Sequence, residues 1–279
     1  MRVLRALTRL ASEIGGRARE GEADEALARI GDLAPDADGV VRLARGVYAS
    51  VPTREGRVRL LRNASARAKQ RVVVVVAVTD ARTHLGRLAF DAPRAILRGL
   101  GMRVREGGDR LVDGAFVHCF FDEEDLLREI ADAGLVVVGR RAFELDLARG
   151  AAPDERPDDV AAEIVRAGRL VGLADATRKR QPAERAIAAM RARGRLAQAR
   201  GPIGRARLRR AIGWVDALRP GGENCYRRVL LELALDAGAA EEVVVLGLDV
   251  GKTGHIAFEH REEMPFDVAF RIEPDSGSP

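Results

Sequence analysis

The apolar positions of the chain divide it into two halves with different patterns. In the first half, apolar runs typical of strands lie between segments with the spacing of amphipathic helices. Residues 71–79 include five consecutive valines, which is typical of a central strand buried on both faces of a sheet. The other elements expected here are helices at 1–28, 54–69, 83–108 and 123–134, and strands at 28–33, 40–48, 111–121 and 135–147. This alternation of strands and helices predicts an α/β layer.

The second half is mostly helical before it ends in a group of strands. Residues 149–160 are rich in proline and acidic side chains, and they have the composition of a linker. Residues 161–218 have helical spacing that is interrupted at Gln181-Pro182 and at 201–204. We therefore expect a first domain at 1–148, a linker at 149–160, a second domain of α+β class at 161–274 and a disordered tail at 275–279.

A cysteine and a histidine lie at the two ends of a helix–strand–turn segment. Cys225 follows a Pro-Gly-Gly sequence and directly precedes a helical pattern. A thiol at the start of a helix is exposed to the positive end of the helix dipole, which favours the nucleophilic thiolate. The strand VVVLGLDV comes next, and it turns through 251–254 to His255, which opens the strand HIAFE.

A carboxylate for this pair is expected on the last strand, FDVAFRI, which carries Asp267. If HIAFE and FDVAFRI form a hairpin centred near Arg261, His255 and Asp267 are each six residues from the centre and are direct cross-strand neighbours. A nucleophile, a base and an orienting carboxylate make a Cys-His-Asp acyl-transfer site. Asp249 and Glu259 are rival carboxylates for His255, and an inert Cys225 in a site that has lost its function is the alternative.

The order of these residues resembles the transglutaminase-like superfamily. RRAIGWVDALRPGGENCYRRVLLELALDAG resembles the cysteine helix of the bacterial lasso-peptide B proteins, and VLGLDVGKTGHIAFE resembles their histidine strand. The resemblance covers roughly residues 165–274 and implies a papain- or transglutaminase-like fold of a helix and an antiparallel sheet. It implies a cysteine peptidase that removes the leader of a ribosomal precursor peptide, with room for a separate leader-binding protein as a partner. The family usually has His-Ala-Trp, whereas this chain has His255-Ile256-Ala257-Phe258.

A second resemblance covers roughly residues 25–148. FVHCFFDEEDLLREIADAGLVVVGRRAFEL resembles the last helix and closing strand pair of class I S-adenosylmethionine methyltransferases, and IGDL, ADGVV and RVRLLRNA resemble the middle of that fold. No glycine-rich loop after an apolar strand precedes Asp32, which is the only candidate for a retained cofactor contact. We therefore expect an incomplete Rossmann-like layer, no bound S-adenosylmethionine and an open sheet edge through which the chain could form oligomers.

Composition limits the compartment and the partners. Two cysteines in 279 residues make no disulfide framework, and the chain has neither a membrane-spanning apolar run nor the apolar core of a signal peptide, so a cytoplasmic protein is expected. The net charge of +5 is concentrated between Arg178 and Arg210. That segment is a solvated helix face or a docking surface for an acidic peptide, and the absence of interleaved aromatic residues disfavours nucleic acid.

Two other patterns are expected to be structural. Gly251-Lys252-Thr253 lacks the glycine spacing and the following helix of a phosphate-binding loop, so it predicts a hairpin turn. Cys119 lies beside His118 in an apolar strand, and with the distant His84 they are too few to form a zinc site, so no metal is expected.

Overall fold

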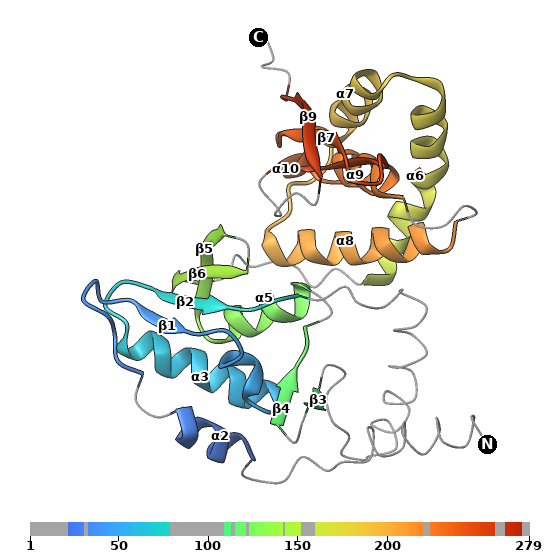
Figure 1. Cartoon of the computed structure of the whole chain (residues 1–279). Helices are drawn as coiled ribbons and strands as arrows, with labels where there is room; N and C mark the ends of the chain where they lie inside the picture. The colour runs from blue at the N-terminus through green and yellow to red at the C-terminus, as the bar shows by residue number, and fades with distance from the viewer. Residues whose placement is uncertain are drawn as a thin grey trace, which may run out of the picture. The chain divides into compact units, whose positions relative to one another are not determined.

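The chain forms two compact units, Met1–Ala152 and Pro153–Pro279, and their boundary falls inside the segment expected to be a linker, 149–160. The computed structural model describes residues 22–30, 33–78, 109–112, 115–120, 123–141, 143–151, 160–219, 224–259 and 266–274. Both units combine helices with β-sheet, so the protein has mixed α/β content (Figure 1). No helix in these ranges is long and apolar enough to cross a membrane.

The N-terminal unit contains a four-stranded sheet with the order β1-β2-β6-β5. Strand β2 (Val72–Val75) pairs in parallel with β1 (Val41–Leu43) and antiparallel with β6 (Glu144–Arg149). Strand β6 also pairs antiparallel with β5 (Leu135–Arg141). The first three valines of β2 are at most 2% exposed, so the valine run is a buried central strand, as its composition predicts.

Helices of this unit pack around the sheet and each other. Helix α3 (Arg54–Arg67) contacts β1 and β2, and α5 (Glu123–Asp132) packs against both α3 and β5. Helix α5 begins with three acidic residues, and Gly134 follows its end with a φ of 74°. These are the end signals that the sequence predicts for this helix. A 3-10 turn, η1 (Tyr48–Ser50), precedes α3.

Several of the strands expected in this half are wrong in type or extent. Residues Glu22–Ile30 form helix α2, and its last residues are not the beginning of a strand at 28–33. Ala23, Ala26 and Ile30 recur at helical spacing, and Ala26 is buried. The strand expected at 40–48 is only the three residues of β1.

Two other expected strands are each a pair of strands. The segment 111–121 contains parts of an antiparallel pair, β3 (Asp109–Val112) and β4 (Ala115–His118). The dipeptide Asp113-Gly114 between them is a hairpin signal that the analysis of the sequence overlooked. The segment 135–147 likewise contains strand β5 and the first part of its antiparallel partner β6. The expected helix at 83–108, the cofactor candidate Asp32 and His84 lie outside the described residues.

The C-terminal unit consists of helices and one antiparallel sheet. Its helices are α6 (Val160–Arg180), α7 (Ala183–Gly194), α8 (Pro202–Ala217), α9 (Cys225–Leu235) and the short α10 (Ala237–Ala240). The break at Gln181-Pro182 is confirmed. The second break covers 195–201 rather than 201–204, because Pro202 is the first residue of α8, a position that suits proline.

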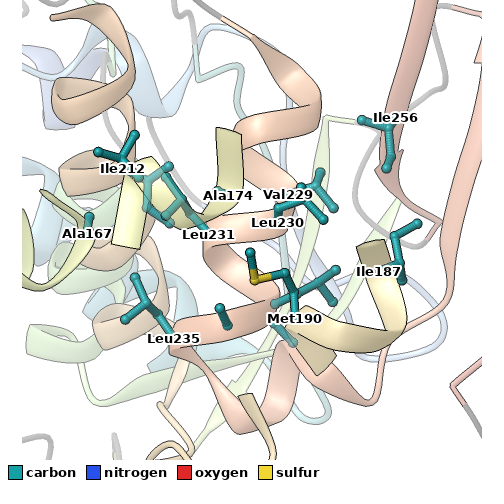
Figure 2. Packing of buried hydrophobic residues seen from close by; sticks show 14 of the residues in the cluster. Ala167, Ala174, Ile187, Met190, Ile212, Val229, Leu230, Leu231, Leu235 and Ile256 are labelled. Atoms are coloured by element: carbon teal, nitrogen blue, oxygen red, sulfur yellow. The ribbon is translucent and has the colours of Figure 1, made fainter. Parts of the chain in front are cut away.

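Helix α9 lies at the centre of this unit. It packs against α6, α7, α8 and strand β8 (Gly254–Phe258), and Leu230, Leu231 and Leu233 are fully buried. Figure 2 shows Met190 and Ile187 of α7, Ile212 of α8 and Ile256 of β8 in the same cluster as the α9 side chains. The helix that carries Cys225 is therefore the core of its unit rather than a peripheral element.

The sheet of this unit has the order β8-β7-β9, with both pairs antiparallel. Strand β7 (Val244–Leu248) lies between β8 and β9 (Asp267–Ile272). The expected hairpin between the strands of His255 and Asp267 is therefore wrong. Strands β8 and β9 pair with opposite edges of β7 and do not pair with each other. The 251–254 segment belongs to the β7–β8 hairpin and leads into a strand, as predicted.

A tight contact between α7 and α9 gives a testable prediction. A Cβ atom on Gly194, the last residue of α7, would lie 1.8 Å from the carbonyl oxygen of Leu233. We expect Gly194→Ala to lower the free energy of unfolding by about 1–3 kcal/mol, measured by urea denaturation, because the two helices must separate. The matched control is Gly172→Ala in α6, where a Cβ meets nothing within 4 Å. This control should raise stability by about 0.5–1 kcal/mol, and equal effects of the two changes would contradict the packing.

Candidate functional site

Cys225 is the first residue of α9, and its neighbour Asn224 caps the helix. The Asn224 side chain accepts a hydrogen bond from the backbone N–H of Arg227 at 2.9 Å. The Cys225 side chain is half-buried and packs against the hydrophobic cluster around α9. The thiol is thus at the positive end of a helix dipole, where the sequence predicts it, and it is held by a core helix.

His255 is held on two sides. Its Nε2 atom lies 3.1 Å from Oδ2 of Asp249, and its ring stacks on the ring of Phe266 with centroids 5.5 Å apart and planes 13° apart. The His255 side chain is 30% exposed, so the imidazole remains partly accessible to solvent. A histidine with one nitrogen on a carboxylate has a fixed orientation, and its second nitrogen is available to accept a proton.

The carboxylate of Asp249 organises the turn that carries His255. It accepts the backbone N–H of Thr253 at 2.8 Å, and Lys252 adopts a left-handed conformation with a φ of 60°. The hydrogen bond from Thr253, followed by the one from His255, holds the pKa of Asp249 below its ordinary value of 3.8. Asp249 is therefore an anion at neutral pH, and it belongs to the same hairpin as the histidine it contacts.

Gly247 makes room for the stacked phenylalanine. It pairs with His255 in one ladder and with Val268 in the other, at a point where the β7–β9 register shifts. A Cβ on Gly247 would lie 2.5 Å from Cδ2 of Phe266 and 2.0 Å from the backbone oxygen of Asp267. A side chain at this position would move Phe266 off the imidazole, so the contact between His255 and Phe266 depends on this glycine.

Asp267 does not occupy the position expected of it. It lies on β9 and pairs with Leu248, two strands away from His255, and its side chain is exposed. The other rival, Glu259, is 2.6 Å from Arg271. The carboxylate that contacts His255 is Asp249, because the β7–β8 turn folds it back onto the strand that follows.

The alternation of side chains along β8 separates His255 from Cys225. Ile256 and Phe258 are buried in the cluster around α9, and Cys225 packs against this same cluster. Successive residues of a strand point to opposite faces of the sheet, so His255 projects to the other face, where Phe266 lies. In the described part of the chain, no hydrogen bond joins the Cys225 thiol to the His255 ring. The structure brings His255 and Asp249 together, and it does not bring Cys225 to them.

Ionic contacts that the sequence reasoning missed fix the start of α9. Asp216 of α8 is fully buried and accepts the backbone N–H of Asn224 at 2.8 Å, together with the side chains of Arg227 and Arg228. Asp175 of α6 accepts a hydrogen bond from Nε of Arg227 at 2.8 Å. Asp216 comes four residues after the apolar Ile212, so the two share the buried face of α8. A carboxylate on a buried helix face needs a charged partner, so this ion pair could have been predicted from the sequence.

The other residues considered from the sequence have structural surroundings. The ring of His118 is buried edge-on against Phe120 with centroids 4.6 Å apart, and Cys119 is a half-buried free thiol. Among the described residues, no group of three or more His, Cys, Asp or Glu is placed to hold a metal ion. No family model, curated protein or solved structure matches this chain.

Proposed function

We propose that the C-terminal unit is a transglutaminase-like cysteine hydrolase that cleaves a peptide bond in a ribosomal precursor peptide. The observation that carries the proposal is the pairing of His255 with the Asp249 carboxylate on a strand that packs against the cysteine helix. The half-buried thiol of Cys225 at the start of α9 supplies the nucleophile. The proposal replaces Asp267 with Asp249 as the orienting carboxylate.

The reaction follows from these positions. Asp249 keeps a proton on Nε2 of His255, which leaves Nδ1 as the base that takes the thiol proton. The thiolate of Cys225 attacks the amide carbonyl carbon, and the first N–H groups of α9 stabilise the resulting oxyanion. His255 then returns its proton to the leaving amine, and a water molecule hydrolyses the thioester to release the acid and the free thiol.

The mechanism requires His255 to leave Phe266 and cross to the face of the sheet that packs against α9, which needs a rearrangement of the backbone at the start of β8. Catalytic hydrogen bonds in free enzymes are often long and form fully only in the complex with substrate. The ring is 30% exposed and lies at the start of its strand, next to the turn, so it is not locked in a closed core. The coupling between thiol and imidazole is therefore the property to measure.

The test is the rate of iodoacetamide alkylation of Cys225 at neutral pH in a Cys119→Ala background, which leaves one reactive thiol. We expect Cys225 to react about ten-fold faster than a free cysteine, because the helix dipole and the imidazole of His255 both favour the nucleophilic thiolate. His255→Ala should slow this alkylation, and Asp249→Asn should slow it by a smaller factor. A rate equal to that of free cysteine and unaffected by both changes would refute the hydrolase.

A second candidate is a non-catalytic peptide-binding module joined to a methyltransferase remnant. The separation of His255 and Cys225 onto different faces of the sheet favours it. The missing Trp in His255-Ile256-Ala257-Phe258 points the same way. In the N-terminal unit, helix α5 followed by the antiparallel pair β5–β6 supports the resemblance to the end of a methyltransferase fold. Calorimetry with S-adenosylmethionine tests that half, and we expect no binding.

A further inference from the structure

Four arginines surround the first turn of α9, where Cys225 lies. They share two carboxylates: Asp175 lies 3.8 Å from Arg178, 3.3 Å from Arg219 and 2.8 Å from Arg227, and Asp216 contacts Arg227 and Arg228. We call these four residues the arginine cluster; its members are Arg178, Arg219, Arg227 and Arg228. The cluster comes from α6, the end of α8 and α9, so it is assembled by the tertiary fold rather than by one helix.

Two members of the cluster share a single carboxylate. Arg178 and Arg219 both contact Asp175, at 3.8 Å and 3.3 Å, so two positive charges face one negative charge. Arg227 is buried between both acids, whereas the side chains of Arg178, Arg219 and Arg228 are 26%, 39% and 30% exposed. The buried arginine holds the helix, and the three outer arginines present their charge to solvent.

Two of the outer arginines retain unused hydrogen-bonding capacity. Arg178 and Arg219 each contact Asp175 through one terminal nitrogen, Nη2. Their Nε atoms are shielded from solvent, so an incoming carboxylate would bind the remaining N–H groups of each guanidinium. Guanidinium groups bind carboxylates through two parallel hydrogen bonds, which makes a carboxylate the matching ligand.

The cluster adjoins the nucleophile. Asp216 accepts the backbone N–H of Asn224, the residue before Cys225, and Arg178 lies near enough to Tyr226, the residue after it, to act on the phenol by its charge. The Tyr226 hydroxyl is 3.5 Å from the backbone oxygen of Ala183, at the start of α7. A chain that reaches Cys225 therefore passes a surface with an excess of arginine side chains.

We propose that the arginine cluster binds carboxylate side chains of an acidic peptide segment and so places that peptide at Cys225. This inference deepens the proposed function by naming its class of substrate, and the binding step itself does not need a reactive thiol. It also gives the basic segment between Arg178 and Arg210 a specific role beyond a solvated face.

The experiment measures binding of a fluorescent oligoglutamate peptide to the full chain carrying Cys225→Ala, at low salt. We expect it to bind at least about ten-fold more tightly than an oligoglutamine of the same length, with affinity falling as salt rises. Removing two of the outer charges in Arg178→Gln/Arg219→Gln should weaken binding about ten-fold. Arg178→Lys/Arg219→Lys should retain part of the affinity, because it keeps the charge and loses the paired hydrogen bonds of the guanidinium.

The matched control removes the same net charge elsewhere in the unit. Arg169→Gln/Arg193→Gln changes exposed arginines on α6 and α7. It should change the affinity by about two-fold or less, because salt screens charges that are distant from the bound peptide. Equal loss in the two double variants would overturn the proposal. Equal affinity for the glutamine peptide, or stronger competition by inorganic phosphate or by single-stranded nucleic acid than by free oligoglutamate, would also overturn it. Peptide binding without accelerated alkylation of Cys225 would refute the hydrolase alone.

Discussion

Replacing Arg57 with methionine is expected to lower the free energy of unfolding of the N-terminal unit by about 3–5 kcal/mol, because it leaves a charged glutamate buried without its partner. The Arg57 side chain is completely buried, and that of Glu129 is 3% exposed. Two hydrogen bonds join them, from Nε at 3.0 Å and from Nη2 at 2.6 Å. The pair connects α3 to α5, so its loss loosens the contact between the two helices of this unit.

Three aromatic contacts surround the pair. The Tyr48 hydroxyl donates to Glu129 at 2.6 Å, and its ring stacks on that of Phe120 with centroids 5.7 Å apart. The guanidinium carbon of Arg57 lies 5.4 Å from the centroid of the same Phe120 ring. Burial, followed by the nearby Glu129 charge, raises the pKa of Tyr48 well above its ordinary value of 10. Tyr48 thus stays a neutral donor, and a single carboxylate satisfies both groups.

The measurement is urea denaturation followed by far-UV circular dichroism, with the fluorescence of Trp214 reporting on the C-terminal unit. The control is Arg59→Met on the same helix as Arg57, which removes the solvent-exposed pair of Arg59 with Asp24 of α2 and should cost about 1 kcal/mol or less. The double change Arg57→Met/Glu129→Leu should cost less than Arg57→Met alone, because no buried charge is left unpaired. A similar loss in Arg57→Met and Arg59→Met would show that this pair is not buried in solution.

Features set by short stretches of sequence were predictable. The valine run is a central strand because its residues are apolar on both faces, and α5 begins and ends where its acids and Gly134 indicate. The turn at 251–254 is equally local, since it depends on turn residues. The sequence also indicates where α9 begins, although this start is held both by the Asn224 cap and by ionic contacts from other helices. Each of these signals acts within a few residues, so the rest of the chain did not need to be known.

The pairing of the last three strands was not predictable in the same way. His255 and Asp267 are equally distant from Arg261 in the sequence, which favoured a hairpin of β8 with β9. Strand β7 has two edges, however, and β8 pairs with one and β9 with the other. Strand periodicity fixes which side chains share a face and leaves open which strand is the neighbour. The alternation of His255 and Ile256 along the strand was readable from the sequence, and the expected Cys-His-Asp site did not take it into account.

Replacing Asp216 with alanine is expected to lower the free energy of unfolding of the C-terminal unit by about 3–5 kcal/mol, because it removes one partner of a buried guanidinium. Arg227 is 4% exposed and would lose the carboxylate of Asp216 while keeping that of Asp175, and the backbone N–H of Asn224 would lose its acceptor. The start of α9 should loosen, so amide exchange of the residues around Cys225 should accelerate more than that of the buried Leu231 at the middle of the helix. Far-UV circular dichroism in urea measures the stability, and hydrogen exchange measures the local effect.

The matched control for this change is Glu241→Ala, which removes an exposed carboxylate that contacts Arg195 at 2.8 Å. It should cost about 1 kcal/mol or less and leave exchange at the start of α9 unaltered. Because Asp216 contacts Asn224 and the two arginines after Cys225, the same carboxylate supports both the thiol and the arginine cluster. If Asp216→Ala were as mild as Glu241→Ala, the helix start would be held by its cap alone, and the cluster would lose its role in positioning the cysteine.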